Sequence, residues 1–135
     1  MRIMAIDYGD ERIGLAVSDL LCTIAGEAWT LSEWNADRAA DTILKECRER
    51  DVGELVLGLP LNMDGTEGPR AEKSRAFKAL LEEKGAPKVI LWDERRTSIA
   101  AHDILHAHGI KMKNHRSKVD AVAASLILEE YLGSK

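Results

Sequence analysis

The stretch RIMAIDYGDERIGLAVSD, residues 2–19, indicates the fold more clearly than any other part of the sequence. It opens with an apolar run, residues 3–6, that ends in an acid and a glycine turn, which is typical of a central strand buried on both faces. Beyond the turn, Ile13, Leu15 and Val17 alternate with smaller residues, as in a second strand. The two halves together predict a β-hairpin.

The rest of the chain shows alternating strand and helix patterns. A third strand is predicted near Glu27–Leu31, and the apolar residues from Ala36 to Cys47 recur at helical spacing. Further elements are predicted at 54–59 (strand), 70–84 (helix), 88–92 (strand), and 97–108 and 116–131 (helices). The order β-β-β-α-β-α-β-α-α predicts one α/β domain over residues 1–135, with a mixed five-stranded sheet and helices on both faces.

Composition restricts the class of protein. The 135 residues are 45% hydrophobic and 31% charged, which is typical of a soluble globular domain, and no apolar run is long enough to cross a membrane. The first residues do not resemble a signal peptide, so we expect a cytoplasmic protein with no membrane partner. The net charge of −4 argues against binding duplex nucleic acid by overall phosphate neutralisation. Basic residues nevertheless cluster at 70–75 and 111–118, where a local basic surface could form.

Two carboxylates follow predicted strands. Asp7 comes directly after the first apolar run, where a charge is costly unless it is paired, hydrogen-bonded or bound to metal. Glu94 follows the fifth strand, where it could either cap the next helix or point into the crevice near Asp7. In open α/β sheets ligands bind at the carboxyl ends of the strands, so a site is expected there.

A third carboxylate, Asp120, lies in the first turn of the predicted last helix. At about 100° per residue it falls roughly 90° from the centre of the expected buried stripe, at its boundary. That stripe is Val119, Val122, Ala123, Leu126 and Ile127. Asp120 could interact with the helix dipole alone or lean toward a metal. Three separate carboxylates suit Mg²⁺ or Mn²⁺, and such ions can hydrolyse a phosphodiester, which makes a nuclease one of several possibilities.

Four segments in order along the chain resemble the YqgF (RuvX) family of Holliday junction resolvase-like proteins and pre-16S rRNA nucleases. They are DYG at 7–9 with RIGLAVSD at 12–19, GLP at 58–60 with DG at 64–65, DER at 93–95 with TS at 97–98, and KVD at 118–120 with AA at 123–124. The resemblance implies a ribonuclease H-like fold. It also implies metal-dependent phosphodiester cleavage, with Asp7, Glu94 and Asp120 as catalytic residues and as ligands of Mg²⁺ or Mn²⁺.

One departure from the wider superfamily concerns the second ligand. Related resolvases commonly carry an acid at the end of the fourth strand, whereas GLPL occupies residues 58–61 here and the next acid is Asp64. Either Glu94 or Asp64 then supplies the ligand, and we favour Glu94.

The resemblance further implies substrate contacts by neighbouring residues. Arg12 and Arg95 are expected to clamp phosphate, because a guanidinium matches its geometry. Thr97 and Lys118 are also expected to contact substrate, and the loop at 60–69 is a candidate lid.

The leading hypothesis is a hydrolase acting on ester bonds, a nuclease that processes the 5′ end of pre-16S rRNA during ribosome biogenesis. Its expected partners are nucleic acid, with pre-rRNA ranked above branched DNA, and ribosomal particles. Holliday junction resolution ranks lower because it ordinarily needs two active sites in a symmetric dimer. A non-catalytic RNA- or ribosome-binding factor and a nucleotide-binding module of the actin and Hsp70 type remain alternatives. The sequence leaves open monomer or homodimer, and endonuclease or exonuclease.

Other residues that could suggest function are assigned structural roles. His102 and His106 have helical spacing, but no zinc motif accompanies them, so they are expected to be exposed. Trp29, Trp34 and Trp92 could stack bases, although packing is the commoner use of tryptophan. The two cysteines, Cys22 and Cys47, are expected to be reduced structural thiols.

Overall fold

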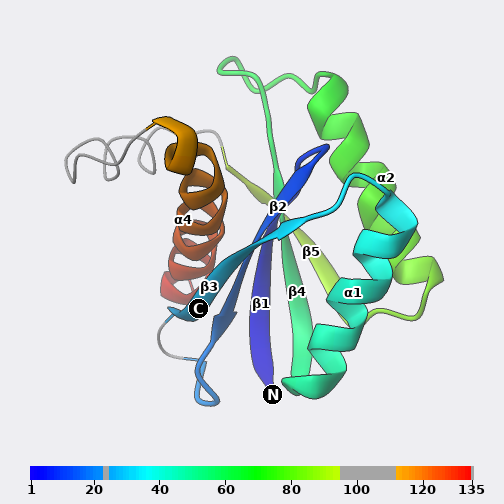
Figure 1. The fold of residues 1–135 in the computed structure, drawn as a ribbon, viewed down its shortest axis with the longest axis vertical. Coiled ribbons are helices and arrows are strands. Elements are labelled where there is room, and N and C mark those ends of the chain that lie inside the picture. Colours follow the sequence, from blue (N-terminus) through cyan, green and yellow to red (C-terminus); the bar gives the residue numbers. More distant parts are fainter. Residues whose placement is uncertain (23–24, 95–111, 135) are drawn as a thin grey trace.

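A computed structural model describes residues 1–22, 25–94 and 112–134 of the chain, with side chains from residue 120 onward in the last range (Figure 1). Its elements are β1 (Arg2–Asp7), β2 (Arg12–Ser18), β3 (Ala25–Ser32), α1 (Ala36–Glu49), β4 (Val52–Leu59), α2 (Pro69–Glu83), β5 (Lys88–Asp93) and α4 (Met112–Gly133). In these ranges, no helix combines the length and the apolar character needed to cross a bilayer.

The five strands form one mixed sheet in the order β3-β2-β1-β4-β5, which confirms the predicted architecture. The β1–β2 and β2–β3 pairs are antiparallel, and β1–β4 and β4–β5 are parallel. Asp7 therefore pairs with Gly14 across the hairpin. The parallel strands β1, β4 and β5 end at the same edge of the sheet, which is where the predicted site lies.

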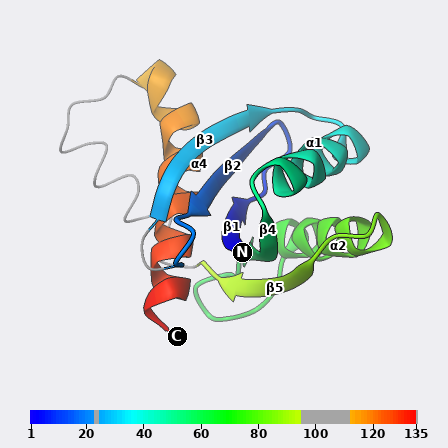
Figure 2. The ribbon, with the colours of Figure 1, turned by 90° about the horizontal axis from the view of Figure 1, so that it is seen from below.

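Helices cover both faces of the sheet. Helices α1 and α2 lie on one face and α4 lies on the other (Figure 2). Alternate residues of β1 supply the two cores: Met4 and Ile6 pack toward α1 and α2, whereas Ile3 and Ala5 pack toward α4. A strand buried on both sides explains why the run at 3–6 is apolar without interruption.

Helix α4 presents a different face from the one predicted. Its buried residues are Ala123, Ala124, Ile127, Leu128 and Tyr131, whereas Val122 and Leu126 are only half-buried. Asp120 precedes this series by three and four residues, so it lies in line with the observed stripe, and it is half-buried, as predicted for a position at the boundary. The helix also begins at Met112 rather than Arg116, and the helix predicted at 97–108 lies outside the described residues.

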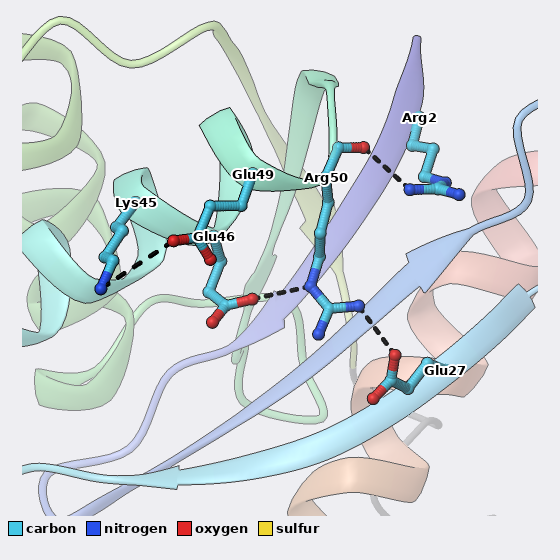
Figure 3. Close-up of polar contacts among 6 residues, drawn as sticks. All are labelled: Arg2, Glu27, Lys45, Glu46, Glu49 and Arg50. Carbon is cyan, nitrogen blue, oxygen red and sulfur yellow. Dashed lines mark hydrogen bonds and ion pairs between the residues drawn. The ribbon is translucent and has the colours of Figure 1, made fainter.

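Arg50 connects the end of α1 to the sheet through polar contacts. These contacts lie at the end of the sheet opposite the carboxyl ends of β1, β4 and β5. Its guanidinium contacts Glu46 and Glu27, each at 2.7 Å, and its carbonyl accepts a hydrogen bond from Arg2 at 3.0 Å (Figure 3). The guanidinium also lies 4.3 Å from the centre of the Trp29 ring. Trp29 is thus used in packing, as expected.

Candidate active site

Asp7 is the last residue of β1 and only 7% exposed. Side chains alternate along a strand, so Asp7 points to the same side as Ile3 and Ala5, toward α4. The end of β1 thus places a carboxylate between the sheet and α4.

Glu94 follows β5 directly and is only 5% exposed. Its backbone N–H donates to the carbonyl of Leu59 at 3.3 Å, which extends the parallel pairing by one step. Its side chain shares a hydrogen bond with that of Asp7. A Cβ at Gly58 would collide with Oε2 of Glu94. Glycine at the end of β4 therefore leaves the space that the Glu94 carboxyl occupies.

Asp120 reaches the same place from α4. The backbone of α4 crosses β2 at Gly14 so closely that a Cβ there would collide with the Asp120 carbonyl. Because Gly14 pairs with Asp7, this crossing brings Asp120 close to Asp7. Oδ2 of Asp120 lies 3.4 Å from Nε of Arg12, an ion pair longer than a good hydrogen bond. The three carboxylates predicted from sequence are thus brought together.

The three carboxyl groups have raised pKa values. Burial, reinforced by the charge of Asp120, raises the pKa of Asp7 to about 6. Burial, reinforced by the charge of Asp7, raises the pKa of Glu94 to about 9. Burial also raises the pKa of Asp120, against the lowering effect of Arg12. At neutral pH the Asp7–Glu94 pair therefore retains one proton, held chiefly on Glu94.

Arg70 belongs to the site, although its position in the sequence indicates only a general basic cluster. It lies exposed in the first turn of α2, and its charge lowers the pKa of all three carboxyl groups. The other two cations of that cluster are paired with acids: Lys73 contacts Asp10 at 2.9 Å, and Arg75 makes two 2.7 Å hydrogen bonds to Glu67. The expected basic surface at 70–75 is therefore largely neutralised.

The remaining predicted site residues do not join the cluster in the described part of the chain. Asp64 is exposed, and its Oδ1 accepts hydrogen bonds from the backbone N–H and the hydroxyl of Thr66. The carboxylate of Asp64 thus stabilises its own loop. Arg95, Thr97 and the side chain of Lys118 lie outside the described residues.

The chemistry of the cluster fits a divalent cation. Three carboxyl groups supply the hard oxygen ligands that Mg²⁺ and Mn²⁺ prefer, and the buried Oε2 of Glu94 has no hydrogen-bond partner. As the side chains stand, no three His, Cys, Asp or Glu residues in the described ranges converge as a metal site. The carboxyl groups of Asp7 and Glu94 lie against each other, and that of Asp120 pairs with Arg12.

The topology is that of the ribonuclease H-like fold, with an acidic cluster at the carboxyl ends of the parallel strands. The fold is shared by a fowlpox virus Holliday junction resolvase, with a TM-score of 0.62 and 18% identity over 100% of both chains. It is also shared by a Thermus thermophilus RuvC bound to a Holliday junction, with a TM-score of 0.56 and 15% identity over 99% of this chain and 97% of that one. The chain belongs to the RuvX family, described as "Holliday junction resolvase", whose match covers residues 1–134.

Curated relatives are similar along their whole length. A protein of Ruminiclostridium cellulolyticum is 39% identical over 133 residues, which is 98% of this chain and 94% of the relative. One of Acetivibrio thermocellus is 41% identical over 138 residues, with 100% and 97% coverage. Both carry the name "Putative pre-16S rRNA nuclease". The family expected from the four motifs is therefore confirmed.

Proposed function

We propose that this chain is a divalent-metal-dependent nuclease that hydrolyses phosphodiester bonds in structured RNA, and that its substrate is the 5′ end of pre-16S rRNA. The proximity of Asp7, Glu94 and Asp120 to one another and to Arg70 carries the proposal. The family and the names of the curated relatives support the choice of reaction and substrate. The two free thiols, Cys22 and Cys47, are consistent with a cytoplasmic protein.

In this proposal Asp7, Glu94 and Asp120 hold Mg²⁺ or Mn²⁺, which when bound activates water and stabilises charge on the leaving oxygen. Glu94 must release its proton before it can act as a ligand, because only the carboxylate binds metal well. Asp120 must turn away from Arg12, and this frees the guanidinium of Arg12 to bind a substrate phosphate. Arg70 supplies a second cation beside the carboxylates.

The test is cleavage of a pre-16S rRNA 5′ leader, and of branched DNA for comparison, with Mg²⁺ or Mn²⁺. We expect Asp7→Asn and Asp120→Asn to lose cleavage by at least about a hundredfold, since each removes a charged ligand. Asp41→Asn, at an exposed residue of α1 that pairs with Lys84, serves as the matched control and is expected to retain activity. Unchanged cleavage by Asp7→Asn would refute the site, and cleavage of branched DNA alone would refute the RNA substrate.

A further inference from the structure

The three tryptophans differ in their surroundings. Trp29 is half-buried and lies against Arg50. Trp92 packs edge-on against Tyr131, with ring centres 5.4 Å apart, and its Nε1 donates to Glu130 at 3.0 Å. Trp34 is 73% exposed, in the connection between β3 and α1. Packing therefore accounts for two of the tryptophans and leaves the third unexplained.

The backbone on both sides of Trp34 is fixed. The N–H of Glu33 donates to the carbonyl of Glu11 at 3.0 Å, which anchors the chain to the β1–β2 turn. After Trp34, the side chain of Asn35 caps α1 by accepting from the N–H of Arg38 at 3.0 Å. An exposed indole between two anchored residues is held in place before any ligand arrives, which lowers the entropy cost of binding.

Arg38 holds the indole from one side. Its guanidinium carbon lies 5.6 Å from the centre of the Trp34 ring, and its Nε lies 3.6 Å from Oε1 of Glu33. The same Glu33 oxygen accepts from the N–H of Asn35 at 3.1 Å. These contacts orient the ring while most of its surface remains open to solvent.

Trp34 borders an open pocket that adjoins the acidic cluster. The pocket has a volume of about 590 Å³ and is lined by Glu11, Arg12, Ser32, Glu33, Trp34 and Arg38. Arg12 is common to both sites, since its Nε also pairs with Asp120. A substrate bound in the pocket would therefore lie beside Arg12, which also contacts Asp120 of the acidic cluster.

The lining indicates which part of a nucleic acid would bind. Two arginines and two glutamates line the pocket, so it carries no net positive charge, and beyond the one phosphate assigned to Arg12 it does not favour an anion. An exposed aromatic face beside a guanidinium suits a flat, neutral base, and such stacking requires that the base be unpaired. We propose that Trp34 stacks an unpaired base of a single-stranded segment of the substrate, next to the scissile bond held at the acidic cluster. This inference rests on the proposed function and adds the substrate feature that the site recognises.

The test measures binding without turnover, in the Asp7→Asn background, so that it does not depend on cleavage. A short single-stranded RNA is titrated while tryptophan emission and affinity are followed, and a fully paired duplex of the same sequence is the comparison. We expect the single strand to quench emission, and Trp34→Phe to abolish most of the quenching. Trp34→Ala should weaken binding roughly tenfold, whereas Trp34→Phe should stay within about threefold because a ring remains.

Leu21→Ala is the matched control. Leu21 is 80% exposed and lies between β2 and β3, at the other end of these strands from Trp34, so its substitution should leave affinity unchanged. A single abasic nucleotide is placed at successive positions of the RNA. It should weaken binding by the Asp7→Asn protein at one position, and at that position it should not weaken further the binding by the protein that also carries Trp34→Ala. Equal affinities for Trp34→Ala and its parent would overturn the inference, as would quenching that persists in Trp34→Phe. The proposed function would be unaffected by either result, because it depends on cleavage by the protein with Asp7 intact.

Discussion

Glu94→Gln is expected to stabilise the folded chain near neutral pH, even though it removes a proposed metal ligand. Glu94 is buried, and its pKa is raised to about 9 from an ordinary value of 4.5. At pH 7 the unfolded chain loses this proton freely, whereas the folded chain retains it. The interval from the ordinary pKa of 4.5 to pH 7 is about 2.5 units, which at about 1.4 kcal/mol per unit corresponds to about 3–4 kcal/mol of lost stability in the wild type.

The direction of the pH dependence follows from the raised pKa. A group that binds its proton more tightly in the folded state contributes stability below its unfolded pKa, here 4.5, and loses that contribution as the pH rises toward about 9. Glutamine does not titrate, and its amide can still donate to Asp7. The variant should therefore match the wild type near pH 4.5 and exceed it by up to about 3–4 kcal/mol at pH 7.

Urea denaturation followed by circular dichroism, in EDTA at several pH values from 4.5 to 8, measures this difference. Glu83→Gln is the matched control, because Glu83 is exposed at the end of α2 and should change stability by less than about 0.5 kcal/mol. Added Mg²⁺ should stabilise the wild type more than Glu94→Gln. A variant that is less stable than the wild type at pH 8 in EDTA, or a difference that does not change with pH, would refute the assignment of a buried proton to Glu94.

Three further outcomes are expected. Gly58→Ala should cost about 1–3 kcal/mol in the urea assay, because its methyl group meets the Glu94 carboxyl; an unchanged midpoint would mean that Glu94 can move aside. Asn35→Ala should cost about 1 kcal/mol of thermal or urea stability, because α1 loses its side-chain cap. Burial raises the pKa of the Cys47 thiol to about 11, so iodoacetamide at pH 8 should label the half-exposed Cys22 first, as mass spectrometry can determine.

The fold could be predicted because its signals are local. The apolar run before Asp7, the alternation in β2 and the helical spacing from Ala36 to Cys47 each describe one element and the face that it buries. The rules for connecting such elements leave few arrangements, and the observed strand order is one of them. Two of the three carboxylates could be placed on the same grounds, since Asp7 ends a strand and Glu94 directly follows one.

The parts that were missed depend on contacts between distant segments. The face of α4 was misplaced because several apolar residues compete for the buried positions, and the close crossing at Gly14 decides among them. Arg70 approaches the carboxylates only because the loop before α2 brings it there. The exposure of Trp34 depends on what its surroundings leave uncovered, which no local pattern encodes.

The close contact between Gly14 and the backbone of α4 has a consequence for how this domain tolerates change. Main chain rests on main chain there, so the separation of Asp7 and Asp120 depends little on the size of the apolar side chains nearby. Substitutions among the buried residues of α4, such as Ile127 and Leu128, can then alter stability while the spacing of the carboxylates is kept. The hydrophobic interior of this chain can thus change without loss of the arrangement of acids, provided that position 14 keeps a hydrogen in place of a side chain.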